Sequence, residues 1–113
     1  MIIHNATFMV ERQMGAEFLD WFAPLAHKAA PVGRAHLSVL REAGNINKKG
    51  GEEKLHPVGT DGEPLSVAFQ VEFESVEDMD KWIGSRFRPL AAAFERRYVN
   101  AGMIFTSVSE RIF

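Results

Sequence analysis

The sequence contains no cysteine among its 113 residues. Disulfide bonds, thiolate nucleophiles and cysteine-ligated metal sites are therefore excluded. Long apolar runs are missing as well: no segment approaches the roughly 20 residues that span a bilayer, and the first residues show no signal-peptide pattern. We therefore expect a cytoplasmic protein that uses neither disulfide bonds nor a membrane.

The chain also lacks a large excess of either positive or negative charge. The chain has 13 Lys and Arg against 15 Asp and Glu, a formal net charge of −2 at pH 7. Nucleic-acid partners favour a strongly basic chain or patch, so we expect none. Apolar residues make up 46% and charged residues 25%, which is typical of a globular protein. The length suits a single domain that covers residues 1–113.

Motifs for metals and cofactors are missing too. The histidines are scattered, and none pairs with a carboxylate at the spacing of a metal site. No glycine-rich phosphate loop, nucleotide fingerprint or serine–histidine pair is present. We expect no metal and no cofactor. The histidines are His4, His27, His36 and His56.

Strands are indicated by side chains that alternate with period two, apolar on one face. The clearest case is residues 65–73. The last segment is ambiguous, because two alternating sets suit an inward face equally: Met103 with Phe105, and Ile104 with Val108. The predicted strands are residues 2–10, 34–43, 65–73 and 103–112.

Two segments, residues 15–29 and about 75–98, repeat apolar residues at helical spacing. Pro24 removes a backbone hydrogen bond from the first, so we predict a kink or break there. Ser75 is the predicted N-cap of the second, and Pro89 is predicted to divide it and to start its second half. The aromatic residues of both helices are interpreted as core in preference to a pocket lining: Phe18, Trp21, Phe22, Phe87 and Phe94.

The order strand–helix–strand–strand–helix–strand predicts a ferredoxin-like βαββαβ domain of the α+β class. Its four-stranded antiparallel sheet would carry both helices on one face, with the first and third strands at the centre. Residues 44–64, with five glycines and two prolines, form a predicted loop of unusual length. The second sheet face mixes apolar and polar groups, and pairing two such faces closes a barrel and protects sheet edges. We therefore expect a homodimer.

Three stretches carry a resemblance to known proteins. Residues 1–7 (Met-Ile-Ile-His-Asn-Ala-Thr), residues 18–21 (Phe-Leu-Asp-Trp) and the run from Val67 to Glu77 resemble an uncharacterised family of small bacterial proteins, similar to the dimeric α+β barrel superfamily. The resemblance implies the fold and a dimer but no established activity. The wider superfamily includes cofactor-free monooxygenases, isomerases, stress-responsive barrels and haem-degrading enzymes, with flat ligands between sheet and helices. Haem use is not expected, because residues 75–98 contain no histidine.

Polar side chains gather on the second sheet face and form the candidate ligand site. They offer an acid, a base and several hydrogen-bonding groups. One interpretation is a wet dimer interface; another is a small-molecule site. An enzyme such as a cofactor-independent monooxygenase or isomerase would use Glu72 or His36 as base, with Asn5 and Gln70 as orienters; a regulatory module would bind without turnover. The candidate residues are Asn5, Thr7, His36, Ser38, Gln70 and Glu72.

Two further patterns have simpler interpretations. RNA-recognition modules share this plan but stack bases on aromatics of the third strand's open face, and here that face has none. The second helix carries a basic side, for which an anion site is conceivable but a solvated face is favoured. The basic side consists of Lys81, Arg86, Arg88, Arg96 and Arg97.

Overall fold

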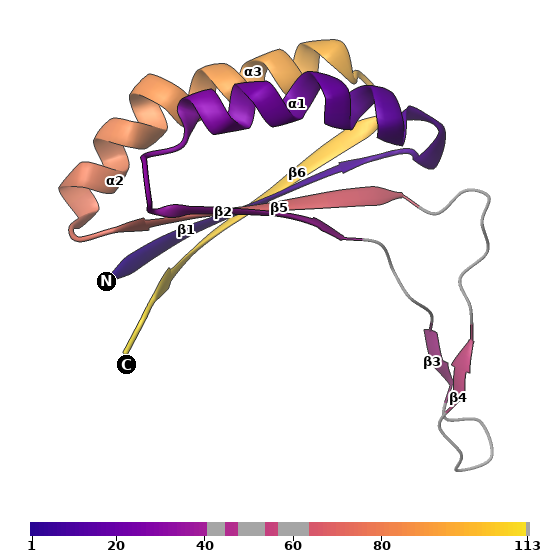
Figure 1. Ribbon diagram of the computed structural model, residues 1–113, viewed down its shortest axis with the longest axis horizontal. Helices are drawn as coiled ribbons and strands as arrows, with labels where there is room; N and C mark the ends of the chain where they lie inside the picture. Colours follow the sequence, from indigo (N-terminus) through magenta and orange to yellow (C-terminus); the bar gives the residue numbers. More distant parts are fainter. Residues whose placement is uncertain (41–44, 48–53, 57–63, 113) are drawn as a thin grey trace.

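The computed structural model describes residues 1–40, 45–47, 54–56 and 64–112 (Figure 1). A 3-10 turn, Arg12–Met14, follows the first strand, and a π-helical turn, Ile83–Phe87, lies within the second helical region. No helix among the described residues is long and apolar enough to cross a membrane. The strands are β1 (Ile2–Val10), β2 (Ala35–Leu40), β3 (Asn45–Asn47), β4 (Lys54–His56), β5 (Leu65–Phe73) and β6 (Gly102–Glu110), and the helices are α1 (Gly15–Ala29), α2 (Val76–Trp82) and α3 (Arg88–Arg97).

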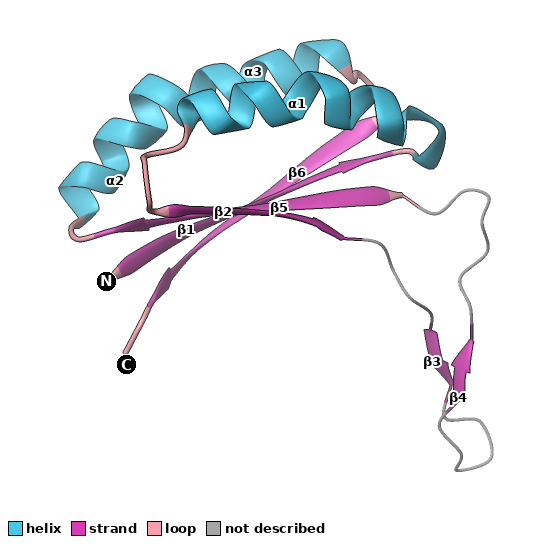
Figure 2. Ribbon diagram, viewed as in Figure 1, coloured by secondary structure: helices cyan, strands magenta, loops and turns pink. Residues whose placement is uncertain are grey.

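The main sheet has the order β2-β5-β1-β6, with antiparallel neighbours throughout. The first and third predicted strands, β1 and β5, are therefore central, as the ferredoxin-like plan requires. All helices lie over one face of the sheet (Figure 2). The short strands β3 and β4 pair with each other inside the predicted loop; the rest of residues 44–64, apart from Pro64, lies outside the described residues.

The core between helices and sheet is strongly aromatic. Its largest fully buried side chains are no more than 1% exposed, and each such burial is worth about 1.5–3 kcal/mol. The predicted core assignment is confirmed for four of the five helical aromatics, while Trp21 is only half-buried. The most deeply buried aromatics are Phe8, Phe18, Phe22, Phe69 and Phe94.

Helix α1 runs without interruption through Pro24. The predicted break is therefore wrong, and the alternative, a kink within a continuous helix, stays a prediction. Pro24 lies on the exposed side, whereas Phe18, Phe22 and Ala26 anchor the same helix in the core. Tertiary packing on both sides of the proline outweighs the lost backbone hydrogen bond, because most helical stability in proteins comes from an amphipathic face that is packed.

The second helical region begins as predicted, and its second α-helix starts beside Pro89 as predicted, but the region is not broken there: helical conformation continues from Val76 to Arg97. The Ser75 hydroxyl oxygen accepts a hydrogen bond from the Asp78 backbone N–H at 3.2 Å, and α3 starts at Arg88 with Pro89 in its first turn. No sequence pattern indicated the π-helical turn between α2 and α3. Its wider spacing keeps Phe87 in the core and places the residues before it on the outer side of the layer.

Strand β6 enters the sheet through a tight approach to α3. Asn100 has a φ of 64°, a left-handed conformation that asparagine tolerates. A Cβ atom at Gly102 would lie 2.6 Å from Phe94 Cζ, so only glycine fits there without displacing the ring. The register pairs Ile104 with Phe8 and Phe105 with Thr7. The ambiguity is thus resolved: Ile104 faces the helices.

Candidate functional site on the open sheet face

The sheet face opposite the helices, called the open face here, carries every candidate ligand residue. On β1 it consists of Ile3, Asn5, Thr7 and Met9, the residues that alternate with the buried His4, Ala6, Phe8 and Val10. Register places the other candidates beside them. The cross-strand rows are His36–Gln70–Asn5–Ser107 and Ser38–Ala68–Thr7–Phe105.

A chain of amide hydrogen bonds crosses the centre of the open face. Gln70 Nε2 donates to Asn5 Oδ1 at 2.8 Å, and Asn5 Nδ2 donates to Ser109 Oγ at 3.2 Å. Each amide NH₂ has two N–H groups, so each retains a second donor, and Gln70 retains its carbonyl oxygen. The chain fixes both amides in place and leaves donors and an acceptor for a ligand.

Glu72 pairs with an arginine that follows β6. Arg111 donates to Glu72 Oε1 at 2.5 Å, and since β1 separates β5 from β6, this ion pair spans β1. No hydrogen bond or ion pair joins Glu72 to His36 within the described part of the chain. His36 is exposed beside Gln70. Of the two proposed bases, His36 is thus the one without an ion-pair partner among the described residues.

One end of the open face is apolar. Met103 and Phe105 on β6 are 58% and 50% exposed, and register places them beside Met9 and Thr7 of β1. A hollow of about 420 Å³ opens at this end, where Met9 and Met103 meet Pro64 and the turn before β6. The face therefore combines an exposed apolar half with a hydrogen-bonding half.

Sequence reasoning missed five residues of this face: Met103, Phe105, Ser107, Ser109 and Arg111. All belong to β6 or follow it. Their role depends on the register between β1 and β6, which joins residues about a hundred positions apart. Strict alternation of side chains along β6 would have assigned them all to the same sheet face. Both alternating sets of β6 contain apolar residues, however, so the pattern did not show which set points toward the helices.

The helix-covered face of the sheet holds a histidine that was not among the predicted ligand-binding residues. His4 is 4% exposed, and its ring meets Phe87 and Trp82 edge to face at centroid distances of 4.7 and 5.5 Å. Its Nδ1 atom has no hydrogen-bond partner among the residues that the structure describes. Burial lowers the pKa of His4 from its ordinary value of 6.5, because the charged imidazolium is poorly solvated there.

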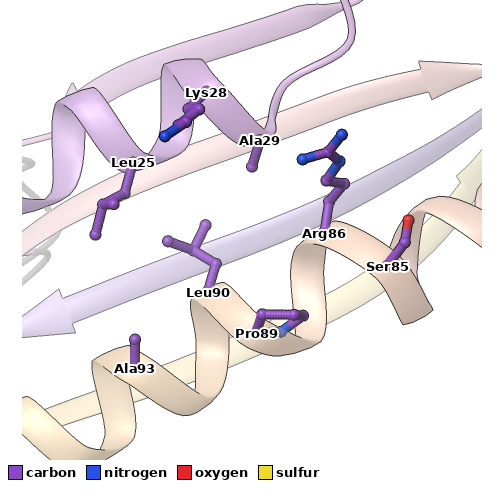
Figure 3. A pocket seen from close by; sticks show the side chains of 8 residues that line it. All are labelled: Leu25, Lys28, Ala29, Ser85, Arg86, Pro89, Leu90 and Ala93. Carbon is purple, nitrogen blue, oxygen red and sulfur yellow. The ribbon is translucent and has the colours of Figure 1, made fainter.

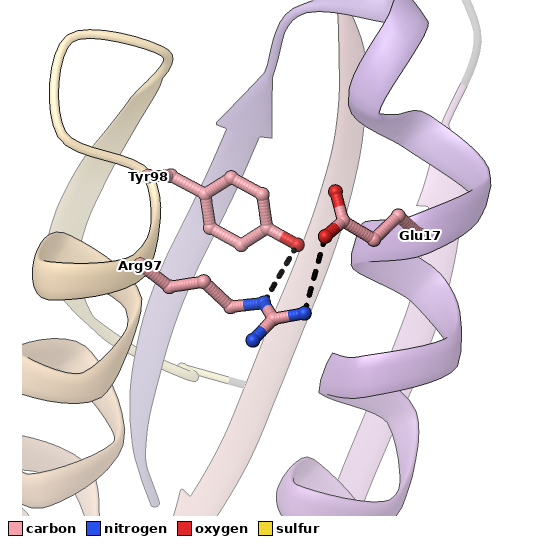
Figure 4. A network of polar contacts seen from close by, with 3 residues as sticks. All are labelled: Glu17, Arg97 and Tyr98. Atoms are coloured by element: carbon pink, nitrogen blue, oxygen red, sulfur yellow. Dashed lines mark hydrogen bonds and ion pairs between the residues drawn. The ribbon is translucent and has the colours of Figure 1, made fainter.

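The space between sheet and helices, where the resemblance places ligands, is occupied by the aromatic core. The helical layer is tied across its outer edge by Arg97 of α3 (Figure 4). Its guanidinium donates to Glu17 Oε1 of α1 at 3.1 Å and to the Tyr98 hydroxyl at 3.4 Å. It also lies 5.2 Å from the centroid of the Trp21 ring. This cluster joins α1 to α3, so the Arg97 guanidinium already has partners on both sides of the helical layer.

Comparison with known proteins identifies the fold and no family. No protein-family model and no curated protein sequence matches the chain. Among solved structures, SnoaB, a cofactor-independent oxygenase from Streptomyces nogalater, matches with a TM-score of 0.57 at 12% identity, covering 99% of this chain and 94% of that one. The de novo designed protein Foldit4 matches with a TM-score of 0.51 at 6% identity, covering 97% of both chains.

A dimeric ferredoxin-like protein from an uncultured marine organism also matches, with a TM-score of 0.46 at 9% identity, covering 100% of this chain and 98% of that one. At such identities the likeness is one of fold alone. Together with the sheet order, the SnoaB and Foldit4 matches confirm the predicted ferredoxin-like α+β architecture.

Proposed function

We propose that the protein is a cytoplasmic homodimer, an α+β barrel in which two open faces pack together and hold a small, flat organic molecule. The observation that carries this proposal is the exposed apolar half of the open face, formed by Met103 and Phe105 beside Met9. Exposed apolar patches on a sheet mark association surfaces. Closing two such sheets also covers side chains that would otherwise face water.

The hydrogen-bonding half of the same face supports the ligand. Asn5 and Gln70 are held by their mutual bond and by Ser109, and His36 and Ser38 extend the polar surface on β2. Fixed amides that keep donors and an acceptor suit the carbonyl and hydroxyl groups of flat aromatic acids, lactones or quinones. Placing them inside a closed dimer would exclude water and strengthen each of these bonds.

The dimer is tested with two substitutions on one strand. Phe105 and Val108 are 50% and 55% exposed but face opposite sides of β6. Phe105→Glu should convert a dimer to a monomer in sedimentation velocity, because it places two like charges in the interface. Val108→Glu, equally exposed on the helix side, should leave the mass unchanged. A wild-type monomer, or equal effects of both variants, would refute the dimer.

The ligand is tested by thermal shift against flat aromatic acids, lactones and quinones. A ligand at a hundredfold excess over its Kd stabilises a fold by about 2.7 kcal/mol, which a melt resolves. Asn5→Ala should abolish the shift while leaving the dimer intact. Persistence of the full shift in Asn5→Ala would place the ligand elsewhere, and silence to every compound would favour a purely structural barrel.

A second candidate function is a cofactor-independent oxygenase, the activity named for SnoaB. It is supported by His36, an exposed imidazole next to the fixed amide of Gln70, which can take a proton from a bound hydroxyl group. Consumption of dissolved O₂ with a stabilising ligand, lost in His36→Gln, would establish it. Ligand-dependent stability without turnover would instead indicate a regulatory module.

A further inference from the structure

A groove lies on the helical layer, on the side of the molecule away from the open face. It runs between α1 and the region where the π-helical turn meets α3, and it has a volume of about 230 Å³ (Figure 3). Leu25 and Ala29 form its α1 wall, and Leu90 and Ala93 form the opposite wall. Most of its lining is thus apolar, although it opens to solvent.

Two cations from different elements reach this groove. Lys28 comes from the last turn of α1 and Arg86 from the π-helical turn. Figure 3 shows Arg86 at the end of the groove away from Leu25 and Ala93, and Lys28 on α1 between Leu25 and Ala29. The ion pairs of the described residues use Arg34, Arg97 and Arg111, and none of them uses Lys28 or Arg86.

A simpler role for these cations is compensation of the negative end of the α1 dipole. That role accounts for Lys28 but not for Arg86, which belongs to another element. The α1 terminus already has partners of its own: Trp82 Nε1 donates to the Ala29 carbonyl at 2.8 Å, and the Ala30 N–H donates to the Ala26 carbonyl at 2.9 Å. Arg86 is therefore in excess of what the helix end requires.

The π-helical turn sets the position of Arg86. One extra residue in the turn changes the direction of the side chains within it, and such turns recur at functional sites. Here Phe87 is buried while Ser85 and Arg86 are directed to the groove. The Ser85 hydroxyl donates to the Lys81 carbonyl at 2.7 Å, so its proton is already used, and the positive charge along the groove comes from the two cations.

We propose that the groove binds a small amphiphilic carboxylate. The carboxylate lies between Lys28 and Arg86, and a single aromatic ring or short branched chain lies against Leu25, Leu90 and Ala93. The volume is below the roughly 300–1,000 Å³ of pockets for drug-sized ligands, which limits the ligand to a compact acid. A neutral analogue would leave both cations without a partner and would bind less well.

The test uses 4-phenylbutyrate as probe and its neutral amide as matched analogue, titrated into the full-length, isotope-labelled protein by NMR. Backbone amide shifts should concentrate in residues 25–30 and 85–93. The amide should bind more weakly than the acid, and affinity for the acid should fall as ionic strength approaches 1 M, where the screening length is about 3 Å. Shifts elsewhere, or equal affinity of acid and amide, would overturn the proposal.

Matched variants separate the groove from general surface charge. Arg86→Gln and Lys28→Gln should each weaken binding about two- to fivefold, as expected for exposed ion pairs. Arg88→Gln removes a neighbouring exposed cation that does not line the groove and should change nothing. Ala93→Leu fills the apolar end and should weaken acid and amide alike. An equal loss in Arg88→Gln, or no loss in Arg86→Gln, would refute the site.

This inference does not depend on the dimer or on the open-face ligand. The Phe105→Glu variant should bind the probe with wild-type affinity, because the groove lies on the other layer of the same chain. Loss of probe binding in that variant, with the fold intact by circular dichroism, would contradict an independent groove site.

Discussion

The two faces of the central strands are built on different principles, although they alternate residue by residue along the same backbone. The helix-covered face of β1 and β5 consists of tightly buried side chains, among them Phe8, Val67 and Phe69. The open face carries Asn5 and Gln70, which are joined to each other by a hydrogen bond. One face supplies the burial that holds the fold, and the other supplies specific groups whose loss the fold can survive.

The largest expected effect is on the free energy of unfolding, and it should differ sharply between two neighbouring residues of β1. Phe8→Ala should lower the free energy of unfolding by about 3–5 kcal/mol, because it opens a cavity in a packed aromatic core. Thr7→Ala, one position along on the open face, should cost less than about 1 kcal/mol. Urea denaturation of both variants gives the values. Comparable losses would mean that the open face is part of the core after all.

Protonation of His4 adds a pH dependence to the buried face. Its pKa is lowered in the folded protein, so the unfolded chain binds the extra proton first. Stability contributed by neutral His4 is complete above about pH 6.5 and falls as the pH drops below that value, by at most about 1.4 kcal/mol per pH unit. Urea midpoints between pH 7 and pH 5 should show this slope.

An exposed histidine provides the control for this pH dependence of stability. His4→Leu should remove the acid-side loss, whereas His27→Gln, at an exposed position of α1, should retain it. If His4→Leu and the wild type lose stability in parallel on acidification, the slope belongs to other groups.

The amide chain of the open face should contribute little to stability. Asn5→Ala removes two hydrogen bonds at a half-buried position, and we expect a loss of about 1 kcal/mol in chemical denaturation, because a typical hydrogen bond contributes only about 0.5–1.5 kcal/mol net to stability. A loss as large as that of Phe8→Ala would assign the amides to folding and would weaken the case for a ligand role.

The smallest effect concerns the cluster on the helical layer. Arg97 and Glu17 are both well exposed, at 41% and 54% of their side chains, so their ion pair should be worth only about 0.2–1 kcal/mol. A double-mutant cycle of Arg97→Gln and Glu17→Gln measures the coupling. A value above that range would show that the contact with Trp21 makes the cluster more than a surface pair.

The contrast between the helix-covered face and the open face also explains which parts of the fold could be predicted from sequence. The bounds of β1, α1 and β5 were predicted as found, because one buried face imposes a regular period. Local rules also located Ser75 and Pro89 correctly. The break at Pro24 was predicted from a local rule that the buried contacts of Phe18, Phe22 and Ala26 override.

The candidate site was only partly within reach of sequence reasoning. Alternation placed Asn5, Gln70 and Glu72 on one face, but their partners Ser109 and Arg111 follow from strand register, which no local pattern encodes. The sheet face to which Phe105 belongs was left undecided, because both alternating sets of β6 contain apolar residues. The groove on the helical layer escaped notice because the π-helical turn has no sequence signature.

That turn also lets the helical region carry one extra residue without changing its buried side. A π-helical turn accommodates one more residue than an α-helical turn, and the extra residue is absorbed within the turn itself. Trp82 and Phe87 are both buried although they lie five positions apart, whereas neighbours on one face of an α-helix lie three or four positions apart. Removing Gly84, which has open space around it, would shorten this interval to four and let the turn close as an ordinary α-helix. Phe87, Leu90 and Phe94 would keep their places in the core. A relative with one residue fewer in this turn would therefore keep the same set of buried side chains throughout α3.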